Sequence, residues 1–228
     1  MPPIDAEARA EGRREAAPVA LVALVVLVGL ALVSRARDWE FVGLPWWIWL
    51  AVAVPSLLLT VDLLLTFGGK GLVRSRRAAL ALLGLLVLGN LVALGLLVAG
   101  LVTTRASELG GGELLLTGFA IWTADVIVFG LLFWELDVGG PAARIVRPQR
   151  TTPDFQFPQD ENPQLATAGW SPVVWDYLYL SLTNSIAFSP TDAMPLSLRA
   201  KAAMGLEAGI SAVTILLVAA RAVNVLGE

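Results

Sequence analysis

Residues 78–102 read AALALLGLLVLGNLVALGLLVAGLV, an apolar run without a single charged side chain. A transmembrane helix needs about 20 such residues to cross the roughly 30 Å of hydrocarbon in a bilayer. Four further runs meet or approach this length: residues 18–33, 45–67, 114–136 and 198–226. The sequence therefore predicts an all-α, polytopic integral membrane protein. It should have about five full transmembrane helices, plus one short re-entrant or sixth helix before the last span.

The composition excludes several classes of protein. The 228 residues are 57% hydrophobic and 15% charged, whereas a soluble domain is nearer half apolar and a quarter charged. The chain has no cysteine and no histidine, which excludes disulfides, thiol nucleophiles and the commonest metal ligand. A net charge of −3 argues against nucleic-acid binding. No paired-carboxylate, nucleophile or phosphate-loop motif indicates an enzyme, so we expect no catalytic residues, no cofactor and no metal site.

The positions of Lys and Arg predict how the spans are oriented, because short cytoplasmic loops carry an excess of both. The segment with Lys70, Arg74, Arg76 and Arg77 is decisive, and placing it in the cytoplasm puts the N-terminus there too. Four regions follow: a cytoplasmic tail at 1–17, a four-helix transmembrane region at 18–137, a proline-rich cytoplasmic loop at 138–170 and a helical hairpin at 171–228. The density of proline in the loop argues against regular helix there.

A short helical segment precedes the last span. Ser171-Pro172 is a helix-start signature, and Asp176 suits the positive end of the helix dipole. The apolar residues run only from Val173 to Phe188, and the helix breaks at Ser189-Pro190. Two interpretations stay open: a re-entrant half-helix that lines a wet cavity, or a short sixth span with a turn outside. Non-helical backbone at membrane depth is tolerated only where protein buries it or water reaches it.

About the last quarter of the chain resembles a known architecture. The run Tyr179-Leu180-Ser181-Leu182-Thr183-Asn184-Ser185 is followed by a polar loop, by Pro195, and by Ser197-Leu198-Arg199-Ala200-Lys201 leading into a long helix. This order is similar to the pore helix, filter and inner helix of two-transmembrane potassium channels. The resemblance implies a pore loop whose candidate filter groups are Thr183, Asn184, Ser185, Ser189, Thr191 and Asp192. The filter glycines of those channels are absent here, so potassium selectivity is not implied.

The chain also resembles an uncharacterised bacterial family of multispanning membrane proteins. The resemblance begins at Phe133-Trp134-Glu135-Leu136-Asp137-Val138-Gly139-Gly140-Pro141 and includes the motifs at 175–179 and 187–192. It implies the inner (plasma) membrane of a bacterium, and the family has no established activity.

Three acidic residues lie inside predicted spans: Asp62, Asp125 and Glu207. An ionisable residue at such a position is a functional-site hypothesis by default. With no Lys or Arg at mid-depth, each acid must face water, share hydrogen bonds or be protonated. A structural hydrogen bond and a place on an ion pathway therefore remain the two alternatives for each of them.

The last span has two distinct faces. At helical spacing Glu207, Ser211 and Thr214 share one stripe, which we interpret as a candidate pore-lining face. Gly205 and Gly209 form the small-xxx-small pattern that lets helices approach closely.

Two functions follow from these features. The first is a cation-conducting homo-oligomer in the lipid bilayer, in which the pore loop and the Glu207 stripe guide a monovalent cation. Oligomerisation is required because a single pore loop cannot enclose a path. The alternative is a non-conducting scaffold or accessory subunit that docks a partner through the proline-rich loop.

Overall fold

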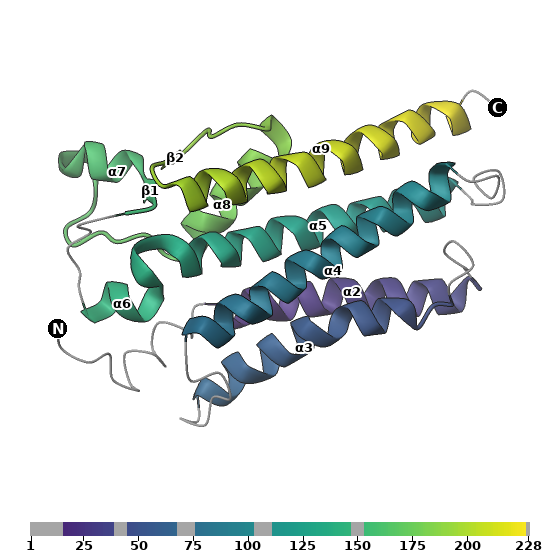
Figure 1. Ribbon diagram of the computed structural model, residues 1–228, viewed down its shortest axis with the longest axis horizontal. Coiled ribbons are helices and arrows are strands. Elements are labelled where there is room, and N and C mark those ends of the chain that lie inside the picture. Colours follow the sequence, from purple (N-terminus) through teal and green to yellow (C-terminus); the bar gives the residue numbers. More distant parts are fainter. Residues whose placement is uncertain (1–15, 39–44, 68–75, 103–110, 147–152, 227–228) are drawn as a thin grey trace.

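The structure, a computed structural model, describes residues 16–38, 45–67, 76–102, 111–146 and 153–226, apart from some side chains in these ranges. Five long helices run beside one another as a bundle, and a small cap of short elements covers one end (Figure 1). The long helices are α2 (Ala17–Ala36), α3 (Ile48–Phe67), α4 (Arg76–Val102), α5 (Gly111–Leu136) and α9 (Leu198–Leu226).

Four of these helices, α2, α4, α5 and α9, are long and apolar enough to cross a membrane. The predictions of spans at 18–33, 78–102, 114–136 and 198–226 are confirmed to that extent. In α3 the described apolar stretch is the shorter Ile48–Leu58, so a fifth full span at 45–67 is not confirmed. The protein is thus an all-α membrane protein with four candidate spans.

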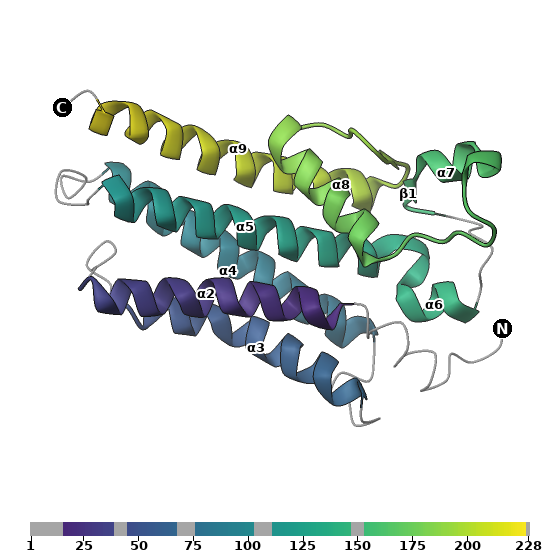
Figure 2. The same cartoon turned by 180° about the vertical axis from the view of Figure 1, so that it is seen from behind.

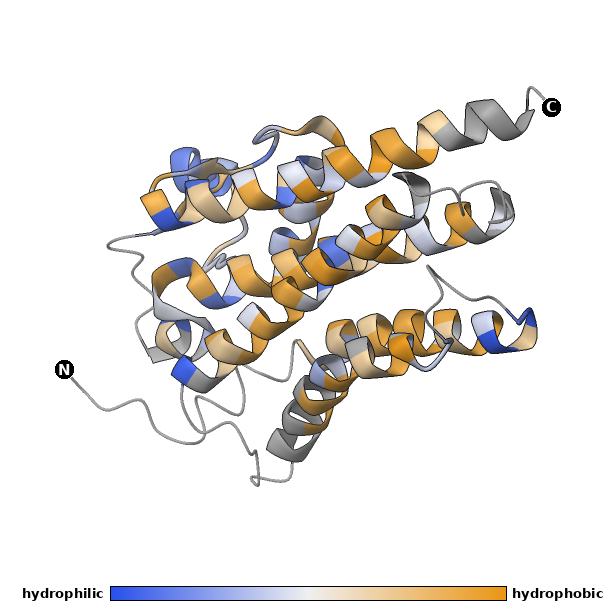
Figure 3. Ribbon diagram, turned by 45° about the vertical axis from the view of Figure 1, so that its right-hand side comes forward, coloured by the Kyte–Doolittle hydropathy of each residue, from blue (hydrophilic) through white to orange (hydrophobic). Residues whose placement is uncertain are grey.

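Helix α5 is the centre of the bundle. It packs against α2, α4, α8 and α9, whereas α3 packs on α2 and α4 (Figure 2). Large apolar side chains also cover the outside of the bundle, including Phe119 at 61% and Leu216 at 65% exposure. Apolar residues run along the long helices and polar ones gather mainly at their ends (Figure 3). Such an apolar exterior is unfavourable in water and suits lipid.

The short helix α8 (Val174–Ala187) packs against both α5 and α9. Its N-cap is Val173 and not Ser171, so the expected start at Ser171-Pro172 is wrong. Asp176 explains the difference, because its Oδ2 accepts a hydrogen bond from the Val173 N–H at 2.8 Å and so caps the first turn. At 14 residues, α8 is about 21 Å long.

After α8 the chain returns to the end of the bundle from which it came. Phe188, with a φ of 53°, closes the helix in the left-handed region. Residues 188–197, here called the returning segment, then run back beside α9 to β2 (Met194–Pro195), which pairs antiparallel with β1 (Phe155–Gln156) (Figure 1). Ser197 caps α9 as expected, since its Oγ accepts from the Ala200 N–H at 3.2 Å.

The connection between α5 and α8 contains more helix than the sequence suggested. It forms η2 (Asp137–Gly139), α6 (Pro141–Val146), α7 (Pro158–Glu161) and η3 (Pro163–Leu165). The last three begin at a proline, where the missing N–H costs nothing and the fixed φ suits a first turn. The expectation that the prolines forbid helix here is therefore wrong for short helices.

Candidate functional site

The polar stripe of α9 points into the protein. Glu207, Ser211 and Thr214 are almost completely buried, with 0%, 0% and 1% exposure. Asn184 of α8 donates from Nδ2 to Oε2 of Glu207 at 2.6 Å and to the carbonyl of Met204 at 3.0 Å. Glu207 also forms a short hydrogen bond with the hydroxyl of Ser181. These contacts fasten α8 to the first half of α9.

Asp125 forms a second buried contact on α5. Its Oδ1 accepts from Nδ2 of Asn90 on α4 at 3.3 Å, and its Oδ2 accepts from Oγ of Ser211 on α9 at 2.9 Å. Neutral donors therefore hold both carboxyl groups in the described chain. Four helices meet in one set of buried groups, which we call the polar core: Asn90, Asp125, Ser181, Asn184, Glu207 and Ser211.

Ser181 limits the proton arrangement within the polar core. Its hydroxyl lies 2.8 Å from the carbonyl of Val126 as well as against Glu207. A hydroxyl has only one proton to donate. A Ser181 that donates to Val126 must therefore receive its other hydrogen bond from a protonated Glu207.

The burial of this stripe corrects its interpretation as a pore lining. Within the described chain Glu207 and Ser211 bond to protein, and Thr214 donates to the carbonyl of Ile210 at 2.8 Å. Periodicity correctly placed the three residues on one face of α9. That face packs against α5 and α8, so in this chain these groups have the structural hydrogen-bonding role.

The candidate filter residues divide into two groups. On α8, the Thr183 hydroxyl lies 2.9 and 3.1 Å from the carbonyls of Tyr179 and Leu180, which share its one proton. Buried Ser185 donates to the carbonyl of Leu182 at 2.8 Å. Asn184 belongs to the polar core. The remaining candidates, Ser189, Thr191 and Asp192, lie in the returning segment, where the first two are exposed and Asp192 is half-buried.

The returning segment leaves part of its backbone unpaired. In the described part of the chain, the N–H groups of Ser189, Thr191 and Asp192 form no hydrogen bond. Pro190 has no N–H to offer. The last backbone hydrogen bond of α8 is from Phe188 to Asn184, and backbone pairing resumes at β2, which pairs with β1. The bend thus presents polar backbone and hydroxyl groups outward.

The structure does not bring Gly205 and Gly209 into this site. The side chain of Asp62 on α3 lies outside the described residues. Gly205 and Gly209 face outward from α9, and nothing lies within 4 Å of a Cβ placed there. They do not pack against a helix of the described chain. The close approaches are made by Gly118, beside Val218, and Gly130, beside Leu178, both on α5.

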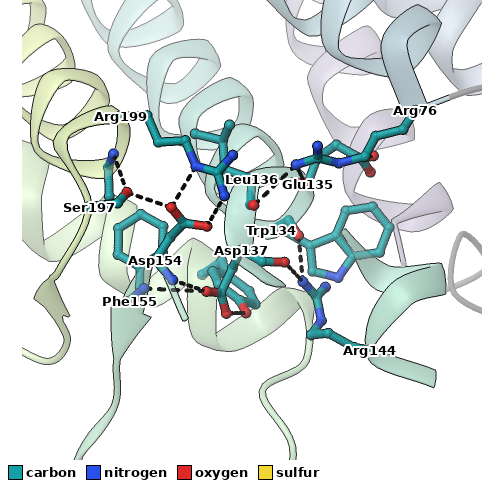
Figure 4. A network of polar contacts seen from close by, with 12 residues as sticks. Arg76, Trp134, Glu135, Leu136, Asp137, Arg144, Asp154, Phe155, Ser197 and Arg199 are labelled. Atoms are coloured by element: carbon teal, nitrogen blue, oxygen red, sulfur yellow. Dashed lines mark hydrogen bonds and ion pairs between the residues drawn. The ribbon is translucent and has the colours of Figure 1, made fainter. Parts of the chain in front are cut away.

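A polar network holds the cap end of the bundle, here called the mouth, together (Figure 4). Asp137, in the turn after α5, accepts from the N–H groups of Asp154 at 2.7 Å and Phe155 at 3.3 Å. Its Oδ2 accepts from the Tyr177 hydroxyl at 2.5 Å. Arg144 donates to the carbonyl of Asp137 at 2.9 Å and lies over the ring of Tyr177. One buried carboxylate thereby positions both β1 and the start of α8.

Asp154 connects this network to α9. Its carboxylate accepts from Nε and Nη2 of Arg199, each at 2.6 Å, and from the Ser197 hydroxyl at 2.5 Å (Figure 4). Burial alone raises the pKa of Asp154, but the hydrogen bonds from Arg199 and Ser197 and the positive charge of Arg199 outweigh it and lower that pKa below its usual value. The bidentate geometry fixes the first turn of α9.

Several of these residues were missed by sequence reasoning. Asn90 carried a signal, since it is the one amide in a span of otherwise apolar residues. Asp137 and Asp154 carried only the local signals of a helix end and a loop, and their partners Tyr177 and Arg199 lie 40 and 45 residues away. Such long-range pairs are not visible in a single sequence.

The chain was compared with known proteins at three levels. No family model, no curated protein and no solved structure matches it.

Proposed function

We propose that the protein is a cation-conducting membrane protein, assembled as a homo-oligomer, in which α8 and the returning segment form a re-entrant pore loop. The observation that carries this proposal is that the N–H groups of Ser189, Thr191 and Asp192 have no partner in the described chain, beside a helix α9 that is long and apolar enough to span a membrane. Lipid cannot satisfy such groups, so protein or water must cover them.

The depth of the bend supports this view. Ile186, in the last turn of α8, lines a cavity together with Thr214 and Ile215 of α9. Between Leu198 and Thr214 the helix rises about 24 Å, which is less than the roughly 30 Å of the hydrocarbon layer. With Leu198 at one surface of that layer, the bend after α8 would lie inside it, and copies of the chain arranged around the bend would enclose the water that its backbone requires.

The chemistry of the bend favours cations. It offers carbonyl oxygens, the hydroxyls of Ser189 and Thr191, and the carboxylate of Asp192, and rings of acidic side chains select cations in channels. Because the bend has no glycine and Pro190 restricts it, we expect little discrimination between potassium and sodium ions. The polar core anchors the loop from behind and does not conduct.

The charge distribution supports the predicted orientation. Arg76 donates to the carbonyls of Glu135 and Leu136 at the mouth, where Arg144 and Arg199 also lie. Cytoplasmic ends of spans carry the excess of arginine. The mouth and the N-terminus then face the cytoplasm of a bacterium, and the loop enters the inner membrane from that side.

Purified protein reconstituted into liposomes tests the proposal. With a potassium or sodium gradient, we expect cation flux above that of protein-free liposomes. Asp192→Asn should lower the flux, whereas Glu161→Gln, which neutralises an exposed acid on α7, should leave it unchanged. Absence of flux from protein that is shown to be folded and oligomeric would refute conduction.

The scaffold alternative receives less support from the connecting loop. Phe155 and Phe157 are buried at 0% and 1% exposure, packed edge-on against Tyr177. The described part of the loop thus completes the hairpin, and residues 147–152 lie outside the described part. Deleting residues 150–163, the direct test of partner docking, should also destabilise α8, so capture of a partner must be compared in protein whose fold has been verified.

A further inference from the structure

Helix α8 ends inside the bundle and leaves space beyond its tip. A cavity of about 550 Å³ lies there, between the first half of α5 and the second half of α9, within the range of roughly 300–1,000 Å³ typical of ligand sites. Its walls are Leu115, Gly118, Phe119 and Trp122 of α5, Ile186 of α8, and Thr214, Ile215, Val218 and Ala219 of α9. All of the wall residues from α5 and α9 belong to candidate membrane spans.

The described walls of the cavity are almost entirely apolar and offer water too few polar partners. The hydroxyl of Thr214 already donates to the carbonyl of Ile210. The indole nitrogen of Trp122 has no hydrogen-bond partner in the described chain, but it is buried and not open to the cavity. A water molecule in a protein cavity needs two to four polar partners, and apolar cavities stay dry.

The cavity is also open toward the exterior of the bundle. Phe119 and Ile186 on its rim are 61% and 57% exposed. At this depth in a bilayer the exterior is hydrocarbon. The cavity is too small to hold a helix of another protein, which is about 10 Å across.

We infer that the cavity binds one hydrocarbon chain of a membrane lipid. From Leu115 to Trp122 the wall of α5 rises about 10 Å, so an extended chain lies parallel to the helices in the half of the membrane away from the mouth. The acyl chain fills the volume that a full-length α8 would occupy, and the end of the acyl chain packs against Ile186 next to the bend. This inference holds whether or not the protein conducts ions.

The experiment uses the full chain in liposomes of phosphatidylcholine that carries a diazirine near the end of one acyl chain. After illumination, we expect cross-links at Ile186 and Trp122. Ala219→Phe fills the cavity and should lower this labelling several-fold, because the acyl chain then has no room between α5 and α9. Ala220→Phe makes the same substitution at an exposed position of α9 outside the cavity wall and should leave the labelling unchanged.

Leu115→Trp fills the cavity from the opposite wall and serves as an independent variant. Elution volume and melting temperature verify that each protein is folded. Equal labelling of Ile186 and Trp122 in the wild type and in both filled variants would overturn the inference. Modification of an Ala219→Cys thiol by a water-soluble maleimide would overturn it in favour of a wet cavity. A disulfide between two copies through that cysteine would overturn it in favour of an interface.

Discussion

Replacing Glu207 should have a large effect on stability because two elements depend on it. Glu207→Ala removes the acceptor of Asn184 and the partner of Ser181 in a fully buried site. A buried group that loses its partner costs about 1–3 kcal/mol. Asn184 keeps the Met204 carbonyl and Ser181 keeps the Val126 carbonyl, which holds this loss near the lower end. The cavity left behind adds about 2 kcal/mol, so we expect a total of about 3–4 kcal/mol.

Glu207→Gln separates shape from charge. The glutamine has the same outline, its carbonyl can accept from Asn184 and its amide can donate to Ser181. We therefore expect a loss below about 1 kcal/mol, and less if Glu207 is protonated in the native protein. Lys201→Ala, an exposed change on the same helix, provides the control.

The assay is the unfolding midpoint of the detergent-solubilised protein, followed by tryptophan fluorescence. A double-mutant cycle with Asn184→Ala should show coupling with Glu207→Ala, because the two residues share one buried hydrogen bond. The reasoning fails if Glu207→Gln destabilises the protein as much as Glu207→Ala. It also fails if Glu207→Ala and Lys201→Ala have the same unfolding midpoint.

Three further predictions concern packing, pH and topology. Gly130→Ala should destabilise the protein by about 1–3 kcal/mol, because the new Cβ would lie 2.7 Å from Leu178 Cδ2. Gly95→Ala, where the new Cβ faces open space, should stabilise the protein slightly. Equal melting temperatures of the two variants would contradict this prediction. The lowered pKa of Asp154 contributes stability that is complete above about pH 4 and is lost as the pH falls further, so Asp154→Asn should abolish that acid-dependent loss in an unfolding titration. Pro190→Cys should react with an impermeant maleimide from the same side as Glu161→Cys, and reaction from the opposite side would indicate a full crossing.

Much of the framework could be predicted from the sequence, because length and apolarity alone identify a helix that can span lipid. The runs at 78–102 and 114–136 and the Ser197 cap are examples. Periodicity also grouped Glu207, Ser211 and Thr214, but it could not tell whether their face meets water or protein. In a membrane both environments accept polar groups and lipid does not, so the pattern is the same in either case.

The remaining features depend on contacts between distant parts of the chain. The outward position of Gly205 and Gly209, for example, follows from the rotation of α9 about its own axis. Two hydrogen bonds fix that rotation, one from α8 to Glu207 and one from Ser211 to Asp125. A small-residue pattern gives no information about that rotation. Similarly, the role of Gly118 depends on Val218, a hundred residues later, and only the folded chain brings them together.

The attachment of α8 to α9 through buried side chains has a consequence for how the protein is made. Outside the bundle α8 would expose the amide of Asn184 to fatty acyl chains, and α9 would expose the carboxyl of Glu207. Each helix is therefore unfavourable in lipid until it packs against the other. We expect the two helices to leave the translocon as a pair and to dock on α5 together. A nascent chain truncated before Glu207 should therefore be retained by the insertion machinery or degraded.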